Sequence, residues 1–135
     1  MGVFIDTSVF VALRNKRDKN HSRAVSLMEG ALQSKYGIIY TSNYVIDETI
    51  TTALIRSRDH KIAVDTGRFI LDSPRIEKLA VGAEEFAIAL EKFKKYGKKL
   101  LSFTDCTSLS LIDRHRIHRI MSFDSDFDGL ASRIY

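Results

Sequence analysis

Acidic side chains occur at four separate places in the sequence where their chemistry could be combined. Asp6 and Asp124 each follow a short apolar run, Asp105 stands at the start of a helical stretch, and Glu48 lies inside another helical stretch. Carboxylates that are brought together repel one another, so a cluster of them persists when divalent cations neutralise it. Ligand sets made only of oxygen favour Mg²⁺ or Mn²⁺ over zinc. A carboxylate-held Mg²⁺ is typical of phosphoryl chemistry, because it polarises a phosphate oxygen and activates water.

Each of these acids also has an ordinary structural interpretation. Asp6 and Asp105 suit the N-caps of helices, and the residues from Asp124 onwards suit a polar turn. Glu48 lies too deep in its helix to cap it, although a solvated position on the helix surface remains open. Its neighbour Asp47 points about 100° away around the helix, and we expect it to be solvated.

The elements that must position the acids are short strands that alternate with helices. Apolar runs predict strands at 2–5, 37–40, 75–81, 117–123 and 133–135. Apolar residues at helical spacing predict helices over 18–34, 45–54, 61–71, 83–96 and 104–115. This alternation predicts an α/β fold with a central, mainly parallel sheet of four to five strands. Sites in such sheets form beyond the carboxyl ends of the strands, so we expect the acids to share one rim.

The composition limits the possible classes of protein. The chain of 135 residues has the length of one domain, 1–135, and its 44% of hydrophobic residues supply a normal core. The single cysteine, Cys106, excludes an intrachain disulfide framework and a cysteine-rich zinc site. We find no apolar run long enough for a membrane span and no signal peptide, so we expect a cytoplasmic protein without a membrane partner.

The charge balance hints at a polyanionic partner. The chain has 21 Lys and Arg against 17 Asp and Glu, a net charge of +4. Without five candidate site acids, 21 basic and 12 acidic side chains remain, a net charge of +9; these acids are Asp6, Glu48, Asp105, Asp124 and the nearby Asp126. A metal-neutralised acidic pocket in a basic body suits a nucleic acid substrate. Arg14, Lys16 and Arg17 follow the first acidic segment and are candidate contacts for its phosphates.

Four stretches of the sequence stand out together: FIDTS (4–8), TSNYVIDET (41–49), SFTDCTS (102–108) and SFDSDF (122–127). In this order they resemble the PIN-domain family, and they are most similar to the stand-alone VapC-type toxin ribonucleases of prokaryotes. They span nearly the whole chain. The resemblance implies a three-layer α/β/α fold and Mg²⁺- or Mn²⁺-dependent endonucleolytic cleavage of RNA. The implied products carry a 5′-phosphate and a 3′-hydroxyl.

The resemblance also implies a role for each acid. Asp6 and Asp105 match the two acids that hold the metal most directly, and Glu48 matches the glutamate that a helix carries into the site. Asp124 matches a fourth acid that binds through water. Asp126 matches a position that is acidic in only part of the family. The acid pattern shows no departure from the family, so nothing in it suggests an inactive enzyme.

Further residues and partners follow from the same resemblance. Ser8 and Thr104 match small hydroxyl residues that support the acids through hydrogen bonds. Arg14, Lys16 and Arg17 become candidate contacts for RNA phosphates. The implied partners are an RNA substrate, a small antitoxin protein and a second copy of the chain in a homodimer.

Other interpretations use the same residues differently. A haloacid-dehalogenase phosphatase would need a second Asp two residues after Asp6, where Ser8 stands. A receiver domain would need adjacent acids near its start and a central phospho-acceptor Asp. A metal-free ribonuclease with paired histidines would stay active in a chelator. A non-toxin RNA-processing nuclease and a non-catalytic RNA- or ribosome-binding module that retains the fold are the remaining alternatives.

Overall fold

A parallel sheet of five strands lies at the centre of the structure, a computed structural model that describes residues 1–135. The strands are β1 (Gly2–Ile5), β2 (Ile38–Ser42), β3 (Ile76–Leu79), β4 (Arg119–Met121) and β5 (Ser132–Ile134). Their order is β3-β2-β1-β4-β5, and every neighbouring pair is parallel. The predicted α/β fold with a mainly parallel sheet is therefore confirmed.

The middle strand, β1, is the most buried part of the sheet. All four of its residues are buried, because β2 and β4 pair with its two edges and helices cover the sheet. Val3 lies opposite Ile39 of β2 on one side and opposite Arg119 of β4 on the other. The chain builds outward from β1 first through β2 and β3, and later through β4 and β5. The carboxyl end of β1 is therefore a topological switch point, where parallel sheets form their sites.

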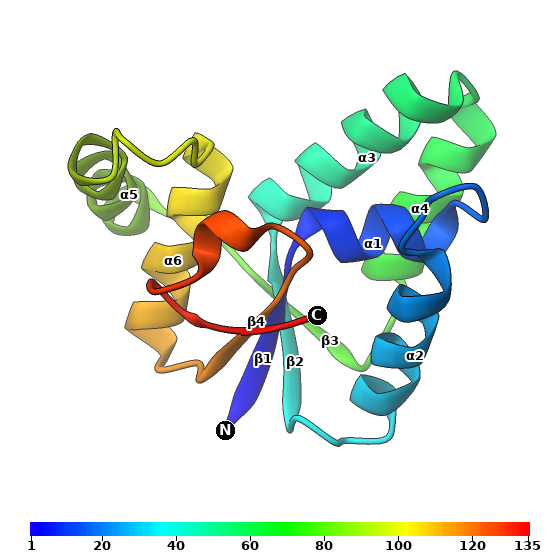
Figure 1. Cartoon of the computed structure of the whole chain (residues 1–135), viewed down its shortest axis with the longest axis horizontal. Coiled ribbons are helices and arrows are strands. Elements are labelled where there is room, and N and C mark those ends of the chain that lie inside the picture. The colour runs from blue at the N-terminus through cyan, green and yellow to red at the C-terminus, as the bar shows by residue number, and fades with distance from the viewer.

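Six α-helices surround the sheet, and they form its two outer layers. They are α1 (Thr7–Arg14), α2 (His21–Leu32), α3 (Asn43–Ser57), α4 (His60–Leu71), α5 (Ala83–Lys95) and α6 (Phe103–His115). Figure 1 shows α2 and α4 on one side of the strands and α5 and α6 on the other. The helix α1 packs against α2 and α3, and α5 packs against α6. None of these helices combines the length and the apolar character that a membrane crossing requires.

The structure differs from the predicted elements at several boundaries. The helix predicted over 18–34 is the shorter α2, and the eight-residue helix α1 that precedes it is not among the predicted elements. The strand predicted over 117–123 ends at Met121. Beyond it, the backbone N–H of Phe123 donates to the hydroxyl of Ser8 instead of to a strand. A short 3₁₀ helix, η1 (Ser125–Phe127), then turns the chain towards β5.

The helix α5 leaves much of its apolar face uncovered. Ala89 is its one buried residue, whereas Phe86 and Phe93 are each 45% exposed. Their rings lean on Phe103 at the start of α6, with centroids 4.9 Å and 6.0 Å away. The predicted amphipathic helix is present, but apart from Ala89 its apolar residues are exposed instead of lying in the core.

Candidate metal centre

Asp6 directly follows β1 and points its carboxylate into the site. Its backbone N–H donates to the carbonyl of Met121, which extends the β1–β4 pairing by one residue. Its Oδ2 accepts hydrogen bonds from the hydroxyls of Ser8, at 3.2 Å, and Ser122, at 2.8 Å. Although Asp6 occupies the N-cap position of α1, its side chain makes no capping hydrogen bond to that helix. The two serine hydroxyls, and not a capping interaction, therefore fix the position of this carboxylate.

Asp105 lies in the first turn of α6 and forms a capping box with Ser102. The backbone N–H of Ser102 donates to Asp105 Oδ2 at 2.9 Å, and the backbone N–H of Asp105 donates to Ser102 Oγ at 3.0 Å. Asp105 thus caps the helix, and this is compatible with the predicted role in the site, because the other oxygen of the carboxylate makes no hydrogen bond and could bind a cation. Thr104 contributes its backbone carbonyl to Thr107 and Ser108, while its own hydroxyl bonds neither acid.

Glu48 reaches the site from the second turn of α3. This helix begins directly after β2, where Ser42 Oγ accepts a hydrogen bond from the backbone N–H of Val45. Glu48 is half-buried, whereas its neighbour Asp47 is exposed, as the helical spacing predicts. The cap therefore fixes the start of α3 so that the glutamate and not the aspartate turns towards Asp6.

Asp124 lies beyond β4, in the segment that leads to β5. Its backbone N–H donates to Ser122 Oγ at 3.0 Å, and its Oδ1 accepts from the backbone N–H of Asp126 at 2.9 Å. Asp124 shares with Asp6, Glu48 and Asp105 a cavity of about 230 Å³. Asp126 does not line this cavity; it enters the site through its backbone N–H alone.

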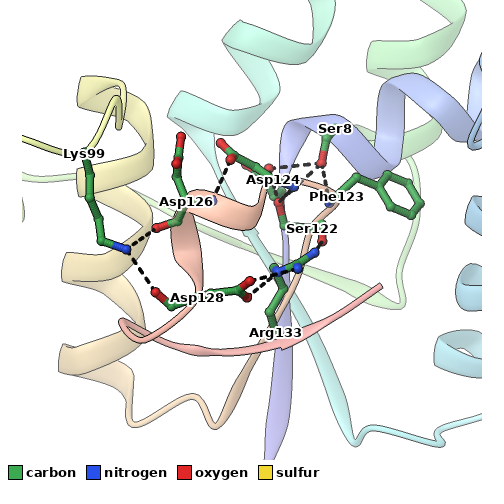
Figure 2. Close-up of polar contacts among 9 residues, drawn as sticks. Ser8, Lys99, Ser122, Phe123, Asp124, Asp126, Asp128 and Arg133 are labelled. Atoms are coloured by element: carbon green, nitrogen blue, oxygen red, sulfur yellow. Dashed lines mark hydrogen bonds and ion pairs between the residues drawn. The ribbon is translucent and has the colours of Figure 1, made fainter.

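Two long basic side chains hold the segment that carries Asp124. Lys99 Nζ donates to the backbone carbonyls of Asp126 and Asp128, at 3.3 Å and 3.0 Å. Arg133 of β5 donates from Nη1 to the carbonyl of Ser122 and from Nε and Nη2 to the carboxylate of Asp128. Figure 2 shows the segment enclosed between these two side chains, with Asp124 on the side of Ser8.

Three of the acids form a cluster that fits one divalent cation. Asp6, Glu48 and Asp105 each offer a carboxylate oxygen, and these oxygens lie within 4.8 Å of one another. Asp6 Oδ1 and the hydroxyl of Thr7 are buried beside the cavity and have no hydrogen-bond partner. A buried oxygen without a partner is costly, and a cation would satisfy it. Because the donors are all oxygens, the set suits a hard ion such as Mg²⁺ better than zinc.

The acids also perturb one another's protonation. Burial raises the pKa of Asp6 from 3.8 to about 6, and the charge of Glu48 adds to the shift. Burial also raises the pKa of Asp105 from 3.8 to about 7, helped by the charge of Asp6. A divalent cation would reverse both shifts, since it stabilises the ionised carboxylates. A positive charge at the centre of the cluster would therefore stabilise the ionised acids.

The remaining predicted residues lie outside the acidic cavity. Arg14, Lys16 and Arg17 line a second, larger cavity next to it. None of the four histidines lines the acidic cavity, so the structure offers no histidine pair there. Sequence reasoning missed Ser102, although its Ser-x-x-Asp spacing is a capping-box signal.

Comparison with known proteins agrees with this arrangement. The model of the PIN-domain family matches residues 3–132. The chain is 33% identical over 128 residues to the 23S rRNA-specific endonuclease VapC20 of Mycobacterium tuberculosis, covering 94% of this chain and 92% of that protein. It is 28% identical over 131 residues to a VapC ribonuclease of Archaeoglobus fulgidus, covering 94% of this chain and 80% of that protein.

Solved structures show the same likeness. The crystal structure of Mycobacterium tuberculosis VapC20, a Sarcin-Ricin loop cleaving toxin, matches with a TM-score of 0.83 and 32% identity, over 94% of this chain and 93% of that one. VapBC2 of Rickettsia felis, bound to a promoter DNA fragment, shares the fold with a TM-score of 0.68 and 14% identity, over 99% and 98% of the two chains. By its sequence, its fold and its cluster of acids, the chain belongs to the PIN-domain family.

Proposed function

We propose that this protein is a divalent-metal-dependent endoribonuclease, acting as one PIN unit over residues 1–135. The observation that carries the proposal is the cluster of Asp6, Glu48 and Asp105, with a buried Asp6 oxygen that lacks any partner within the protein. The ribonuclease names of relatives that match 94% of the chain support the same activity. Mg²⁺ or Mn²⁺ is the proposed ion, because all the donors are carboxylate oxygens.

The chain's own residues divide the work between holding the ion and orienting its ligands. Asp6, Glu48 and Asp105 would hold the ion, which supplies Lewis-acid chemistry to a phosphodiester and to water. Ser8 and Ser122 fix Asp6 through its Oδ2, so that Oδ1 is left to bind. Asp124 stands at the wall of the same cavity, where it helps to complete the ligand set. No side chain needs to act as a covalent nucleophile.

The proposed substrate is structured RNA, and ribosomal RNA is the first to test because the 33%-identical relative is specific for 23S rRNA. The experiment incubates 23S rRNA with the protein in Mg²⁺ or Mn²⁺ and maps new 5′ ends. Wild type should cleave, whereas Asp6→Asn and Asp105→Asn should not. Asp47→Asn is the matched control, since this exposed acid adjoins Glu48 but points away from the site.

Two outcomes of this experiment would contradict the proposal. Cleavage that survives EDTA would point to histidine chemistry instead of a metal. Binding of RNA without cleavage in either metal would indicate a non-catalytic RNA-binding module. Cleavage of a precursor RNA but not of 23S rRNA would leave the nuclease proposal intact and would favour a non-toxin RNA-processing nuclease.

We also propose that the protein is the toxin of a toxin–antitoxin pair and forms a homodimer in the cytoplasm. The relative that cleaves the Sarcin-Ricin loop is described as a toxin. The partly exposed apolar face of α5 offers area for a protein contact. Growth arrest on expression, absent in Asp6→Asn, would support the toxin role. Light scattering of the purified protein would test the dimer.

A further inference from the structure

A second cavity next to the acidic one is lined by basic side chains. It encloses about 500 Å³ between the end of α1, the second half of α3 and the start of α4. Its volume lies in the range of sites that bind small molecules, about 300–1,000 Å³. Four cations line it against a single acid, Asp59; these cations are Arg14, Lys16, Arg17 and Arg56. We call it the basic cavity.

The basic cavity and the acidic cavity share a wall. Val11 of α1 and Arg56 of α3 line both of them. On α3, Glu48, Thr52 and Arg56 follow one another at intervals of four residues, which places them along one side of the helix. From Glu48 to Arg56 the helix rises about 12 Å. An RNA strand with one phosphate at the acids would therefore reach Arg56 if it continued along α3 towards the basic cavity.

The cations of the basic cavity are poorly neutralised within the protein. Arg56 forms an ion pair with Asp18 at 3.6 Å, and its side chain is still 58% exposed. Arg14 rests on the ring of Phe69, 5.3 Å from its centroid, and forms no ion pair. Lys16 and Arg17 are exposed and form none either. Four cations gathered with only Asp59 in the lining and Asp18 beside Arg56 as counter-charges favour an incoming anion.

The floor of the basic cavity is apolar. Val11 and Ala53 are 3% and 6% exposed, and Ile62 of α4, which is 38% exposed, is the third apolar residue of the lining. A cavity with cations around an apolar floor suits a ligand that carries both an anionic group and a ring. A nucleotide has both, whereas a free phosphate ion has only the anionic group. Arginine also binds phosphate through two parallel hydrogen bonds and stacks on planar groups.

We propose that the basic cavity binds a nucleotide of the RNA substrate beside the scissile phosphate, with Arg56 contacting the phosphate that links the two sites. This inference rests on the proposed ribonuclease function and adds to it a subsite that sets how the strand is oriented. An acidic protein segment would satisfy the same charges. The wall shared with the acidic cavity favours RNA, because a substrate bound at the acids extends directly into the basic cavity.

The test compares two substrates in Mn²⁺: an RNA oligonucleotide, and bis-p-nitrophenyl phosphate, which is too small to reach both cavities. Arg56→Met should raise KM for the RNA about tenfold, the effect of removing one charge-assisted hydrogen bond. Because Arg56 also lines the acidic cavity, the variant is compared on both substrates, and its effect on the RNA should be clearly larger than its effect on the small diester. The salt dependence of RNA binding should fall by about 0.7 in log–log slope for each phosphate that the variant no longer binds. The double change Lys16→Met and Arg17→Met should act in the same direction.

Two control variants separate this effect from charge loss and from misfolding. Arg75→Met removes an exposed arginine just before β3, at the opposite end of the strands, and should leave the KM for RNA unchanged. Asp18→Asn breaks the ion pair of Arg56 and should not raise that KM. A rise in Asp18→Asn equal to that in Arg56→Met would show that the ion pair matters for structure, which would overturn the inference.

The failure of this inference differs from the failure of the proposed function. If wild type cleaves neither RNA nor the small diester, the ribonuclease proposal fails. If wild type cleaves RNA and Arg56→Met has the same KM and salt slope, the nuclease stands and the subsite is wrong. If Arg56→Met weakens binding of an oligoglutamate peptide but not of RNA, the basic cavity is a protein site instead.

Discussion

Asp6 and Asp124 follow neighbouring strands and reach the same cavity, yet the protein holds them in different ways. Asp6 is buried and is fixed through its own carboxylate oxygen by two serine hydroxyls. Asp124 is half-exposed and sits on a segment that Lys99 and Arg133 hold through its backbone and through Asp128. The buried acid thus depends on contacts to its own carboxylate, whereas the half-exposed acid depends more on the segment that carries it.

The largest expected effect is the loss of a buried acid. Asp6→Asn and Asp105→Asn should each lower kcat/KM for RNA at least about a thousandfold, because each removes a charge that the metal needs. Isothermal titration with Mn²⁺ should show a matching loss of binding. If Asp124→Asn abolished metal binding as completely as Asp6→Asn, the contrast drawn between the buried Asp6 and the half-exposed Asp124 would be wrong.

The pH dependence of stability should show the same contrast. The folded, metal-free protein holds protons on Asp6 and Asp105 up to about pH 6 and 7, whereas the unfolded chain loses them near pH 4. The folded state thus binds more protons between these values, so its free energy of unfolding falls as pH rises from about 4 to 7. Thermal unfolding in EDTA should show this fall, and Mn²⁺ at pH 7 should restore stability.

A variant provides the control for that measurement. Asp105→Asn removes one of the two titrating carboxylates, so its Tm in EDTA should fall less steeply between pH 4 and 7. Asp126→Asn should keep the wild-type slope, because this acid does not line the acidic cavity. Equal slopes in all three proteins would show that the decline comes from other titrating groups.

Ser122 should have an intermediate effect, because it joins the two acids. Its hydroxyl donates to Asp6 Oδ2 and accepts from the backbone N–H of Asp124. Ser122→Ala should lower activity about 10- to 100-fold, as loss of a group that orients a metal ligand does. Cleavage rates over a range of Mn²⁺ concentrations would measure it. The exposed Ser125 in the same segment is the matched control, and Ser125→Ala should change little.

Arg133 should have a smaller effect, and one that depends on Asp124. Arg133→Met removes the hydrogen bonds to Ser122 and Asp128 and should lower kcat severalfold. Because it acts through the segment that carries Asp124, Arg133→Met should add no further loss in an Asp124→Asn background. Losses that simply add in the double variant would show that Arg133 contributes only to general stability. Arg133→Lys should not rescue, since lysine lacks the fork that spans both partners.

The smallest expected effect belongs to Asp126. Its backbone N–H, and not its carboxylate, contacts Asp124. Asp126→Asn should therefore leave the cleavage rate within about twofold of wild type, since the backbone hydrogen bond survives the substitution. A loss as large as that of Asp124→Asn would place Asp126 among the metal ligands, and this part of the comparison would have to be redrawn.

The sequence predicts the architecture well because its signals are local. The apolar run before Asp6 marks a strand, and helical spacing separates Glu48 from Asp47, as the structure shows. Support for the acids is harder to predict, because it depends on residues brought together by folding. Ser122 lies 116 residues from Asp6, so no local pattern links the two. Ser102, which bonds Asp105, is the exception, because its Ser-x-x-Asp spacing is a local signal, although the family resemblance points to Thr104 instead. The exposed face of α5 is equally hard to predict, since an apolar stripe looks the same over a core or at a rim.

The position of β4 has a consequence for the synthesis of the protein. β1 is translated before β4, so its second edge stays unpaired until β4, at Arg119–Met121, has been made. Asp105 and Asp124 are likewise translated after Asp6 and Glu48. A nascent chain that stops before β4 therefore has neither the complete sheet nor the complete set of acids. We expect nuclease activity only from a chain that extends through β4 and Asp124.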